Sequence, residues 1–243
     1  MATVPRMTGA TSIRAMTYNI RQALGVDGQR RPDRILRILN EARADLIALQ
    51  EVSDPTGQAV AGEPLRFYSR ETGLLGIAAP TNGQGARPYG NVLLSKWPIL
   101  ESQAIDLTVS GREPRNAIRA ILQRPNGRVR VIATHLGLSL GERRIQTNAL
   151  ATLVAEDLEI PTILLGDLNE WRGRSRRAWR FARLLETAEQ PRSFPSRWPV
   201  LPLDQIWTRH HRGHSKVFAL RTGEAGIASD HLPVIADIKL AAA

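Results

Sequence analysis

The feature that most constrains this chain is an acid and an amide placed directly after a buried strand. Residues 163–165 form the apolar run Ile-Leu-Leu, and Gly166-Asp167-Leu168-Asn169 follows at once. A short apolar run bounded by a turn residue predicts a buried β-strand. Asp167 and Asn169 therefore emerge where that strand ends. Burial without a partner is costly for both groups, so the pair is suited to holding a water molecule beside a charged oxygen.

A second cluster of the same kind lies near the C-terminus. Ser229-Asp230-His231 precedes another apolar stretch, Leu232 to Ile238. Two strand-end clusters of acid, amide and imidazole, far apart in the sequence, predict one active site assembled from distant segments.

The size and composition of the chain favour one α/β (α+β) domain spanning 1–243. With 243 residues and 42% hydrophobic content, the chain can build a large core without covalent cross-links. Residues 1–12 are polar, do not resemble a signal peptide, and are expected to be disordered or loosely held. No apolar run approaches the ~20 residues that span a bilayer.

The absence of cysteine narrows the chemistry further. With 0 cysteines the chain has no disulfide, no thiolate zinc site and no cysteine nucleophile. This composition fits a reducing cytoplasm, and we expect a monomer located there.

The net charge of +10 has two interpretations. One is a polyanionic partner: nucleic acid, an anionic lipid surface or a phosphorylated substrate. The other is solubility together with arginine-rich codon usage, since lysine occurs only at Lys96, Lys216 and Lys239. Charge alone does not choose between them.

Apolar patterning predicts strands connected by both hairpins and helices. Expected strands are Ile13–Ile20, Leu46–Leu49, Asn91–Ser95, Ala117–Arg124, Arg128–Thr134, Leu203–Thr208, Ser215–Arg221 and Leu232–Leu240. Pro125-Asn126-Gly127 is the turn of a hairpin. Expected helices are Pro32–Ala44, Arg176–Glu186 and Glu142–Glu159, the last with Ile145, Ala149 and Leu153 on its buried face. Hairpins mixed with crossover helices predict two packed sheets, mixed or mostly antiparallel, with helices outside.

Polar residues with catalytic potential fall at the ends of these strands. They are Asn19, Glu51, His135, Asp167, Asn169, Asp204, Asp230 and His231. Each has an ordinary structural explanation when taken alone, such as a turn residue or a hydrogen-bonded core histidine. Together they form a set of hard oxygen donors that suits Mg²⁺ or Mn²⁺.

Six motifs that carry these residues occur in one order along the chain. They are Met16-Thr17-Tyr18-Asn19-Ile20, Leu49-Gln50-Glu51-Val52, Thr134-His135-Leu136, Gly166-Asp167-Leu168-Asn169, Leu203-Asp204-Gln205-Ile206 and Ser229-Asp230-His231-Leu232. In this ordered set the chain resembles the endonuclease/exonuclease/phosphatase superfamily of the DNase I-like fold, and within it small bacterial metal-dependent hydrolases. The resemblance implies a four-layer α/β sandwich with a divalent metal, Mg²⁺ or Mn²⁺, at the mouth between two sheets.

The resemblance also implies roles for individual residues. Glu51 would be the main metal ligand, with Asp230 and Asn19 near the ion. Asp167 would orient or deprotonate the attacking water, and Asn169 would donate to a phosphoryl oxygen. His231 would bind the phosphoryl group or act as the base. The sequence leaves the base open between Asp167 and His231.

The remaining implied roles concern orientation and substrate contact. Asp204 would fix the His231 tautomer, and His135 would contact phosphate. The basic segment with Arg112 and Arg115 would either touch phosphate or form a solvated loop, and Asn91 would shape the rim of the pocket.

These roles describe a metal-dependent phosphodiesterase that acts on nucleic acid or a phospholipid-type diester by in-line attack of water. Val52-Ser53 after Glu51 replaces the threonine-lysine of abasic-site endonucleases, so the resemblance does not name the substrate. Two alternatives remain at this stage: a phosphomonoesterase of the same fold, and a non-catalytic protein that binds nucleic acid or an anionic surface.

Overall fold

Two β-sheets pack face to face and helices cover both outer faces. The computed structural model describes residues 12–54, 63–81, 89–171, 179–209 and 216–240. The six-stranded sheet has the order β10 (Lys216–Ala219), β11 (Val234–Lys239), β1 (Ser12–Asn19), β2 (Leu46–Ser53), β4 (Tyr89–Ser95), β3 (Leu75–Pro80). The five-stranded sheet has the order β5 (Ile99–Asp106), β6 (Asn116–Arg124), β7 (Gly127–His135), β8 (Thr162–Asp167), β9 (Asp204–Arg209).

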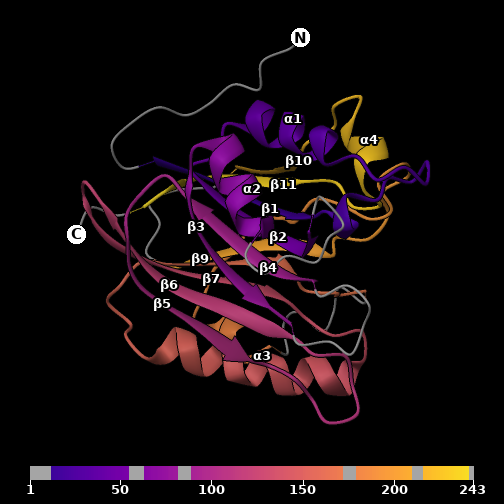
Figure 1. Cartoon of the computed structure of the whole chain (residues 1–243). Coiled ribbons are helices and arrows are strands. Elements are labelled where there is room, and N and C mark those ends of the chain that lie inside the picture. Colours follow the sequence, from indigo (N-terminus) through magenta and orange to yellow (C-terminus); the bar gives the residue numbers. More distant parts are fainter. Residues whose placement is uncertain (1–11, 55–62, 82–88, 172–178, 210–215, 241–243) are drawn as a thin grey trace.

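Helices α1 (Pro32–Ala42), α2 (Glu63–Thr72) and α4 (Ala225–Ala228) lie over the first sheet, and α3 (Leu140–Ala155) lies over the second (Figure 1). The predicted α/β sandwich is thereby confirmed.

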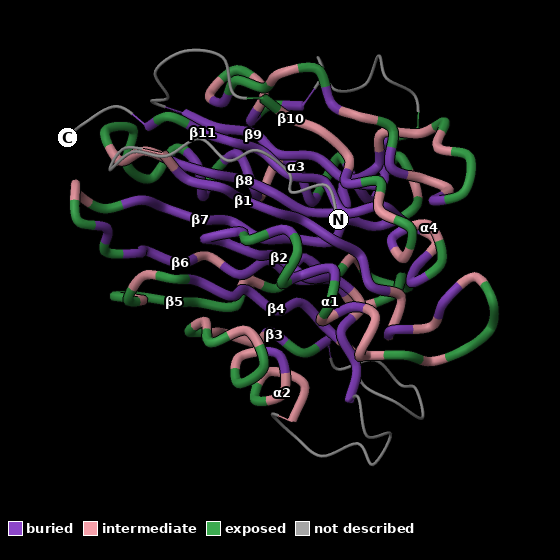
Figure 2. Tube along the Cα trace, turned by 90° about the horizontal axis from the view of Figure 1, so that it is seen from above, coloured by how far each residue is buried: buried purple, intermediate pink, exposed green. Residues whose placement is uncertain are grey.

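Strand alternation explains how these layers stay together. Along β1, Ile13 and Ala15 face the second sheet, whereas Met16 and Tyr18 face α1. Because successive strand residues point to opposite faces, an apolar strand can serve two cores at once. Central strands such as β1, β7 and β8 are accordingly buried along almost their whole length, while β5 at the edge is mostly exposed (Figure 2).

Two parallel strand pairs bring the polar clusters to one end of the sandwich. β1 pairs with β2 and β7 pairs with β8 in parallel, through crossovers that contain α1 and α3. The carboxyl ends of these four strands therefore meet at the same end. Antiparallel β9 begins there, so that Asp167 lies in register with both His135 and Asp204.

The helix predicted at 142–159 exists, but its bounds and its buried face differ. α3 begins at Leu140 after Ser139, whose Oγ accepts a hydrogen bond from the Glu142 amide at 3.2 Å. Ile145 is 57% exposed, and the buried face carries Gln146 and Leu150. Leu153 is buried as expected, but Gln146 and Arg143 share the buried side of the helix because they bind the loop after β7.

The helix predicted at Arg176–Glu186 is wrong over its described part. Residues 180–183 form only a short 3-10 helix, η3 (Arg180–Arg183), and Glu186 bridges to Thr208. Trp179 and Phe181 both pack against Trp207, at ring separations of 6.2 and 5.3 Å. Two residues that are two positions apart do not share a face of an α-helix, so this aromatic packing excludes one.

The expectation for residues 1–12 concerns a segment that lies, except for Ser12, outside the described residues. Within the described part of the chain, no helix is long and apolar enough to cross a membrane.

Candidate active site

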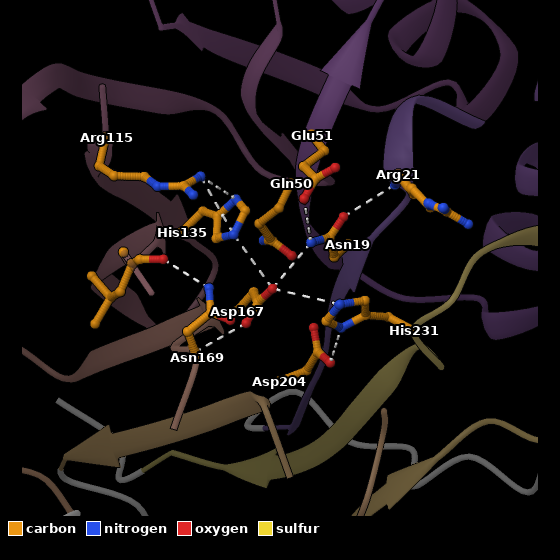
Figure 3. A network of polar contacts seen from close by, with 12 residues as sticks. Asn19, Arg21, Gln50, Glu51, Arg115, His135, Asp167, Asn169, Asp204 and His231 are labelled. Carbon is orange, nitrogen blue, oxygen red and sulfur yellow. Dashed lines mark hydrogen bonds and ion pairs between the residues drawn. The ribbon is translucent and has the colours of Figure 1, made fainter. Parts of the chain in front are cut away.

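Asp167 lies at the centre of a buried polar network where the two sheets open (Figure 3). Its Oδ2 accepts a hydrogen bond from Asn19 Nδ2 at 3.0 Å. The Nε2 atoms of His135 and His231 lie 3.4 and 3.7 Å from the same oxygen. One carboxylate oxygen is thus surrounded by side chains from β1, β7 and the segment before β11.

Asn19 connects Asp167 to the neighbouring acid. The same Nδ2 donates to Glu51 Oε1 at 3.0 Å, and Asn19 Oδ1 accepts from the backbone amide of Arg21 at 3.0 Å. The Ser229 hydroxyl donates to the Asn19 carbonyl at 2.8 Å. Asn19 is therefore fixed in orientation from three directions.

A bulge in β2 aims Glu51 into this network. The register between β2 and β4 shifts between Leu49 and Val52, and Glu51 has a φ of 53°. A non-glycine residue in this region costs about 1–3 kcal/mol, a type of strain that is concentrated at functional sites. Burial raises the Glu51 pKa, the Asn19 hydrogen bond opposes the shift, and the Asp167 carboxylate raises it further. The carboxyl groups of Glu51 and Asp167 thus lie close together, on two sides of the Asn19 amide.

The turn after β8 holds Asp167 and Asn169 together. Asn169 donates its backbone amide to Asp167 Oδ1 at 3.0 Å and its Nδ2 to the Leu136 carbonyl at 2.8 Å, with a φ of 50°. Gly166 is required just before this turn, because a Cβ there would lie 1.9 Å from the Thr134 carbonyl oxygen.

His231 is held between two carboxylates. Its Nδ1 lies 2.8 Å from Asp204 Oδ2, and the Phe194 ring packs on it at 4.9 Å. Burial lowers the His231 pKa, but the Asp204 and Asp167 carboxylates outweigh burial and raise the pKa to about 10. In the metal-free protein the His231 side chain is therefore the positively charged imidazolium at neutral pH, with a proton on each ring nitrogen.

His135 has the opposite charge state. Burial and the neighbouring Arg115 guanidinium lower the His135 pKa to about 3. Arg115 Nη1 lies 3.1 Å from His135 Nδ1, and Arg115 Nη2 donates to Glu113 at 2.7 Å. A neutral histidine and a buried arginine thus lie side by side at the edge of the network.

The other predicted site residues lie around this centre at different depths. Asp230 is 3.5 Å from Arg21 Nε, and its side chain remains 30% exposed. Asn91 lines the same hollow as Glu51 but donates to Asn116 Oδ1 at 2.8 Å. Arg112 is exposed and shares a pocket of about 370 Å³ with Arg115.

The donor chemistry of the site fits a hard divalent cation. Ligand atoms of Asp167, Asp204 and His231 lie within 4.8 Å of one another, but a protonated His231 cannot ligate a metal. Glu51 and Asp230 offer carboxylate oxygens to a cation, and a bound cation would offset the burial that raises the Glu51 pKa. We therefore regard the Glu51 side of the network as the place that fits Mg²⁺ or Mn²⁺.

Sequence reasoning missed several polar residues that support the site. Gln50 accepts from Thr17 Oγ1 at 3.2 Å, and Asn116 orients Asn91. On α3, Gln146 Oε1 accepts from the Gly137 amide at 2.8 Å and Arg143 donates to the Gly137 carbonyl at 3.2 Å, so they fix the loop after His135. The available signal was polar residues at positions where a helix buries its inner face.

Comparisons with known proteins agree with this geometry. The chain is 31% identical to the Escherichia coli K12 protein YbhP, named as uncharacterized, over 163 residues that make up 63% of each chain. The match therefore covers less than two thirds of that relative. An endonuclease/exonuclease/phosphatase structure from Beutenbergia cavernae aligns with a TM-score of 0.77 and 22% identity, over 95% of this chain and 72% of the other.

A second solved structure, the human Nocturnin catalytic domain with bound sulfate anion, aligns with a TM-score of 0.73 and 26% identity, over 95% of each chain. The sequence profile described as Endonuclease/Exonuclease/phosphatase family matches residues 16–231, which include all the residues of the polar network. This chain belongs to the endonuclease/exonuclease/phosphatase family.

Proposed function

We propose that the chain, as one domain, is a divalent-metal-dependent hydrolase that cleaves a phosphodiester by in-line attack of water. Family membership supports hydrolysis of a phosphoester bond. The observation that carries the proposal is the Asp167 carboxylate, with one oxygen shared among Asn19, His135 and His231 and with Glu51 one hydrogen bond away. Sulfate bound to the Nocturnin domain supports a site of this fold that accepts a tetrahedral oxyanion.

Glu51 and Asp230, with Asn19 beside them, would hold Mg²⁺ or Mn²⁺. When bound, such an ion polarises a phosphoryl oxygen and offsets charge on the leaving oxygen. The Asn19 amide keeps Glu51 and Asp167 at a fixed separation, because its Nδ2 donates to both carboxylates at 3.0 Å.

We assign the proton acceptor to Asp167, because a positively charged His231 would act as a donor. His231 is protonated in the metal-free protein, since two carboxylates raise its pKa to about 10 against the effect of burial. A protonated imidazole donates to the phosphoryl group rather than accepting a proton. Asp204 supports that state through the 2.8 Å contact with Nδ1. Asn169, held by Leu136, retains a second amide hydrogen for a phosphoryl oxygen.

A hollow beside the network favours a diester over a monoester. The pocket of about 370 Å³ that contains Arg112, Leu138 and Ser139 adjoins Arg115, which contacts His135. It offers room for a group esterified to the phosphate, and its lining combines two arginines, Arg112 and Arg115, with two acids, Glu113 and Glu142. The diester is of nucleic acid or phospholipid type. A phosphomonoesterase would leave this hollow without a role.

Hydrolysis of two small esters tests the proposal. The purified chain is given bis(p-nitrophenyl) phosphate or p-nitrophenyl phosphate, with Mg²⁺ or Mn²⁺ and then with excess chelator. We expect the diester to be cleaved in a metal-dependent reaction that Asp167→Asn slows about 10²–10⁴-fold. Asp157→Asn, an exposed aspartate beyond the far end of α3, serves as the control and keeps full activity.

Two results would contradict the proposal. Cleavage of the monoester alone would reject the diester assignment. Salt-sensitive binding of nucleic acid or vesicles with no metal-dependent turnover would favour a non-catalytic binding protein.

A further inference from the structure

Two tryptophans on segments that are bonded to site residues are exposed to solvent. Trp171 is 48% exposed and Trp198 is 80% exposed, whereas Trp179 and Trp207 are 6% and 5% exposed. Single exposed apolar residues are common on protein surfaces and need no explanation by themselves. The positions of these two relative to the polar network make them informative.

Trp198 lies on a loop that is bound to the His231 segment. Phe194 packs against the His231 ring at 4.9 Å, and the Ser196 amide donates to the Asp230 carbonyl at 2.7 Å. A turn closed by the Trp198 amide and the Pro195 carbonyl at 3.1 Å then presents the indole. Two residues span at most about 7 Å, so the Trp198 backbone lies close to Ser196 and hence to the rim of the site.

Trp171 approaches from the other sheet. It follows Asn169 by two residues, so its Cα atom lies within about 7 Å of the Asn169 Cα atom. The Asn169 amide donates to Asp167 Oδ1 at 3.0 Å. Trp171 thus continues from the end of β8 in the five-stranded sheet, while Trp198 is attached to the segment that leads into β11 of the six-stranded sheet. The backbones of both tryptophans are thus tied to segments that carry site residues, one from each sheet.

Positive charge accompanies the exposed rings. Arg197 is exposed immediately before Trp198, and the exposed Arg112 lines the pocket of about 370 Å³ together with Arg115, Glu113 and Glu142. Cationic groups that follow a phosphate backbone, together with aromatic rings on which bases stack, are the usual combination for binding single strands. A phospholipid has its apolar part on one side of the phosphate only, which leaves one of the two rings without a partner.

We propose that Trp171 and Trp198 stack on unpaired bases on either side of the scissile phosphate, so that the substrate class is single-stranded nucleic acid. The proposal rests on the function proposed above, since it assigns the substrate of the same site. Stacking needs exposed base faces, which a duplex hides between its base pairs. The rings therefore select single strands over duplex without reading their sequence.

Binding without turnover tests this substrate class. In an Asp167→Asn background with Mg²⁺, fluorescence anisotropy compares a labelled oligothymidylate with an abasic oligomer of the same length and charge. We expect Trp198→Ala to weaken binding of the oligothymidylate about 5- to 150-fold and to leave the abasic oligomer unaffected. Trp171→Ala shows the same selectivity, and Trp198→Phe retains part of the affinity because a smaller ring still stacks.

A matched control uses an exposed apolar residue away from the site. Leu158→Ala, at 49% exposure beyond the far end of α3, should bind both oligomers as the background protein does. Circular dichroism of each variant confirms folding.

Three results would overturn the proposal. The first is equal loss of both oligomers in Trp198→Ala, and the second is no loss of either. The third is a Trp198-dependent association with phosphatidylglycerol vesicles in the absence of Trp198-dependent oligonucleotide binding, which would indicate a lipid surface instead. Cleavage of bis(p-nitrophenyl) phosphate by the protein with native Asp167 is measured separately, so the substrate class can fail while the hydrolase proposal stands.

Discussion

The two ends of the sandwich both bury an ion pair, but the cations differ. At the end away from the candidate site, Arg14 Nε and Nη2 donate to Asp237 Oδ1 and Oδ2 at 2.7 and 2.8 Å. The two side chains are only 1% and 6% exposed. At the candidate site, His231 pairs with Asp204 at 2.8 Å, with side chains 7% and 0% exposed. Geometry and burial are similar at the two ends.

The difference lies in what happens when each pair is broken. Arginine cannot release its proton in a protein, so a buried Arg14 without its acid would remain an uncompensated charge. Histidine can release its proton and become neutral. The far pair must therefore stay intact, whereas loss of Asp204 from the near pair leaves an imidazole that can become neutral.

Two arginines of the five-stranded sheet have a similarly fixed role at the end away from the candidate site. Arg130 and Arg209 donate to the Val154 carbonyl at the end of α3, each at 3.1 Å. Cations at a helix C-terminus compensate its unpaired carbonyl groups. Near the candidate site, Asp204 Oδ1 and Gln50 Nε2 are buried and have no hydrogen-bond partner among the described residues. Buried polar atoms without a hydrogen-bond partner among the described residues occur at both ends, since Arg130 Nε and Arg209 Nε also lack one.

The largest expected effect follows from removing the acid of the near pair. Asp204→Asn should lower kcat about 10²–10⁴-fold, because His231 loses the carboxylate that orients and protonates it. The free energy of unfolding should change much less, since His231 can become neutral. Steady-state kinetics on the diester and urea unfolding measure the two effects. A loss of stability that accounts for the loss of activity would contradict the comparison, and His231→Gln provides a second variant for the same test.

The same substitution at the far end should have the reverse effect. Asp237→Asn leaves Arg14 charged and incompletely paired, so we expect a loss of about 3–5 kcal/mol in the free energy of unfolding. Under conditions where the variant is folded, kcat should match that of the unsubstituted protein. Urea unfolding with parallel activity assays provides the measurement. A large drop in kcat of the folded variant would show that the two ends are coupled.

The two site histidines should give opposite pH dependences of stability in chelated protein. The folded pKa of His231 is raised to about 10 by Asp204 and Asp167 despite burial, while unfolded histidine has a pKa of ~6.5. Its contribution is thus fully present below ~6.5 and is lost as pH rises towards 10. Burial and Arg115 lower the folded pKa of His135 to about 3, so its burial costs stability as pH falls from ~6.5 towards 3.

Unfolding measured across pH separates the two contributions. His231→Gln should remove the alkaline loss and leave the acidic loss, and His135→Gln should do the opposite. Parallel curves for all three proteins would show that neither pKa is shifted as described.

The smallest effect is expected from a pair at the far end whose lysine is exposed, although its aspartate is only 3% exposed. Lys96 Nζ lies 3.4 Å from Asp45 Oδ1, but the lysine side chain is 59% exposed. Such pairs contribute about 0–1 kcal/mol, and Asp45 Oδ2 still accepts from the Arg14 amide at 3.0 Å. Lys96→Met should therefore change the free energy of unfolding by less than ~1 kcal/mol. A loss as large as that of Asp237→Asn would mean that burial does not set the difference between these pairs.

Several elements could be predicted from the sequence because their signals are local. The hairpin of β6 and β7 follows from two apolar runs separated by Pro125-Asn126-Gly127, and its turn lies at the expected place. The polar residues at strand ends were also predictable, because an acid directly after a buried strand is conspicuous in the sequence. Edge strand β5 has mostly exposed residues and gives no comparable apolar signal.

The sequence by itself determined which side chains end the strands and in which order they occur. Only the tertiary structure decided that Asn19, Asp167 and His231 meet, because that contact depends on how two sheets with parallel crossovers are packed. The bulge that turns Glu51 inward and the loop that attaches Trp198 to His231 likewise depend on residues distant in sequence. Local propensity acts over a few neighbouring residues, whereas charge state and proximity at this site arise from burial that the whole fold creates.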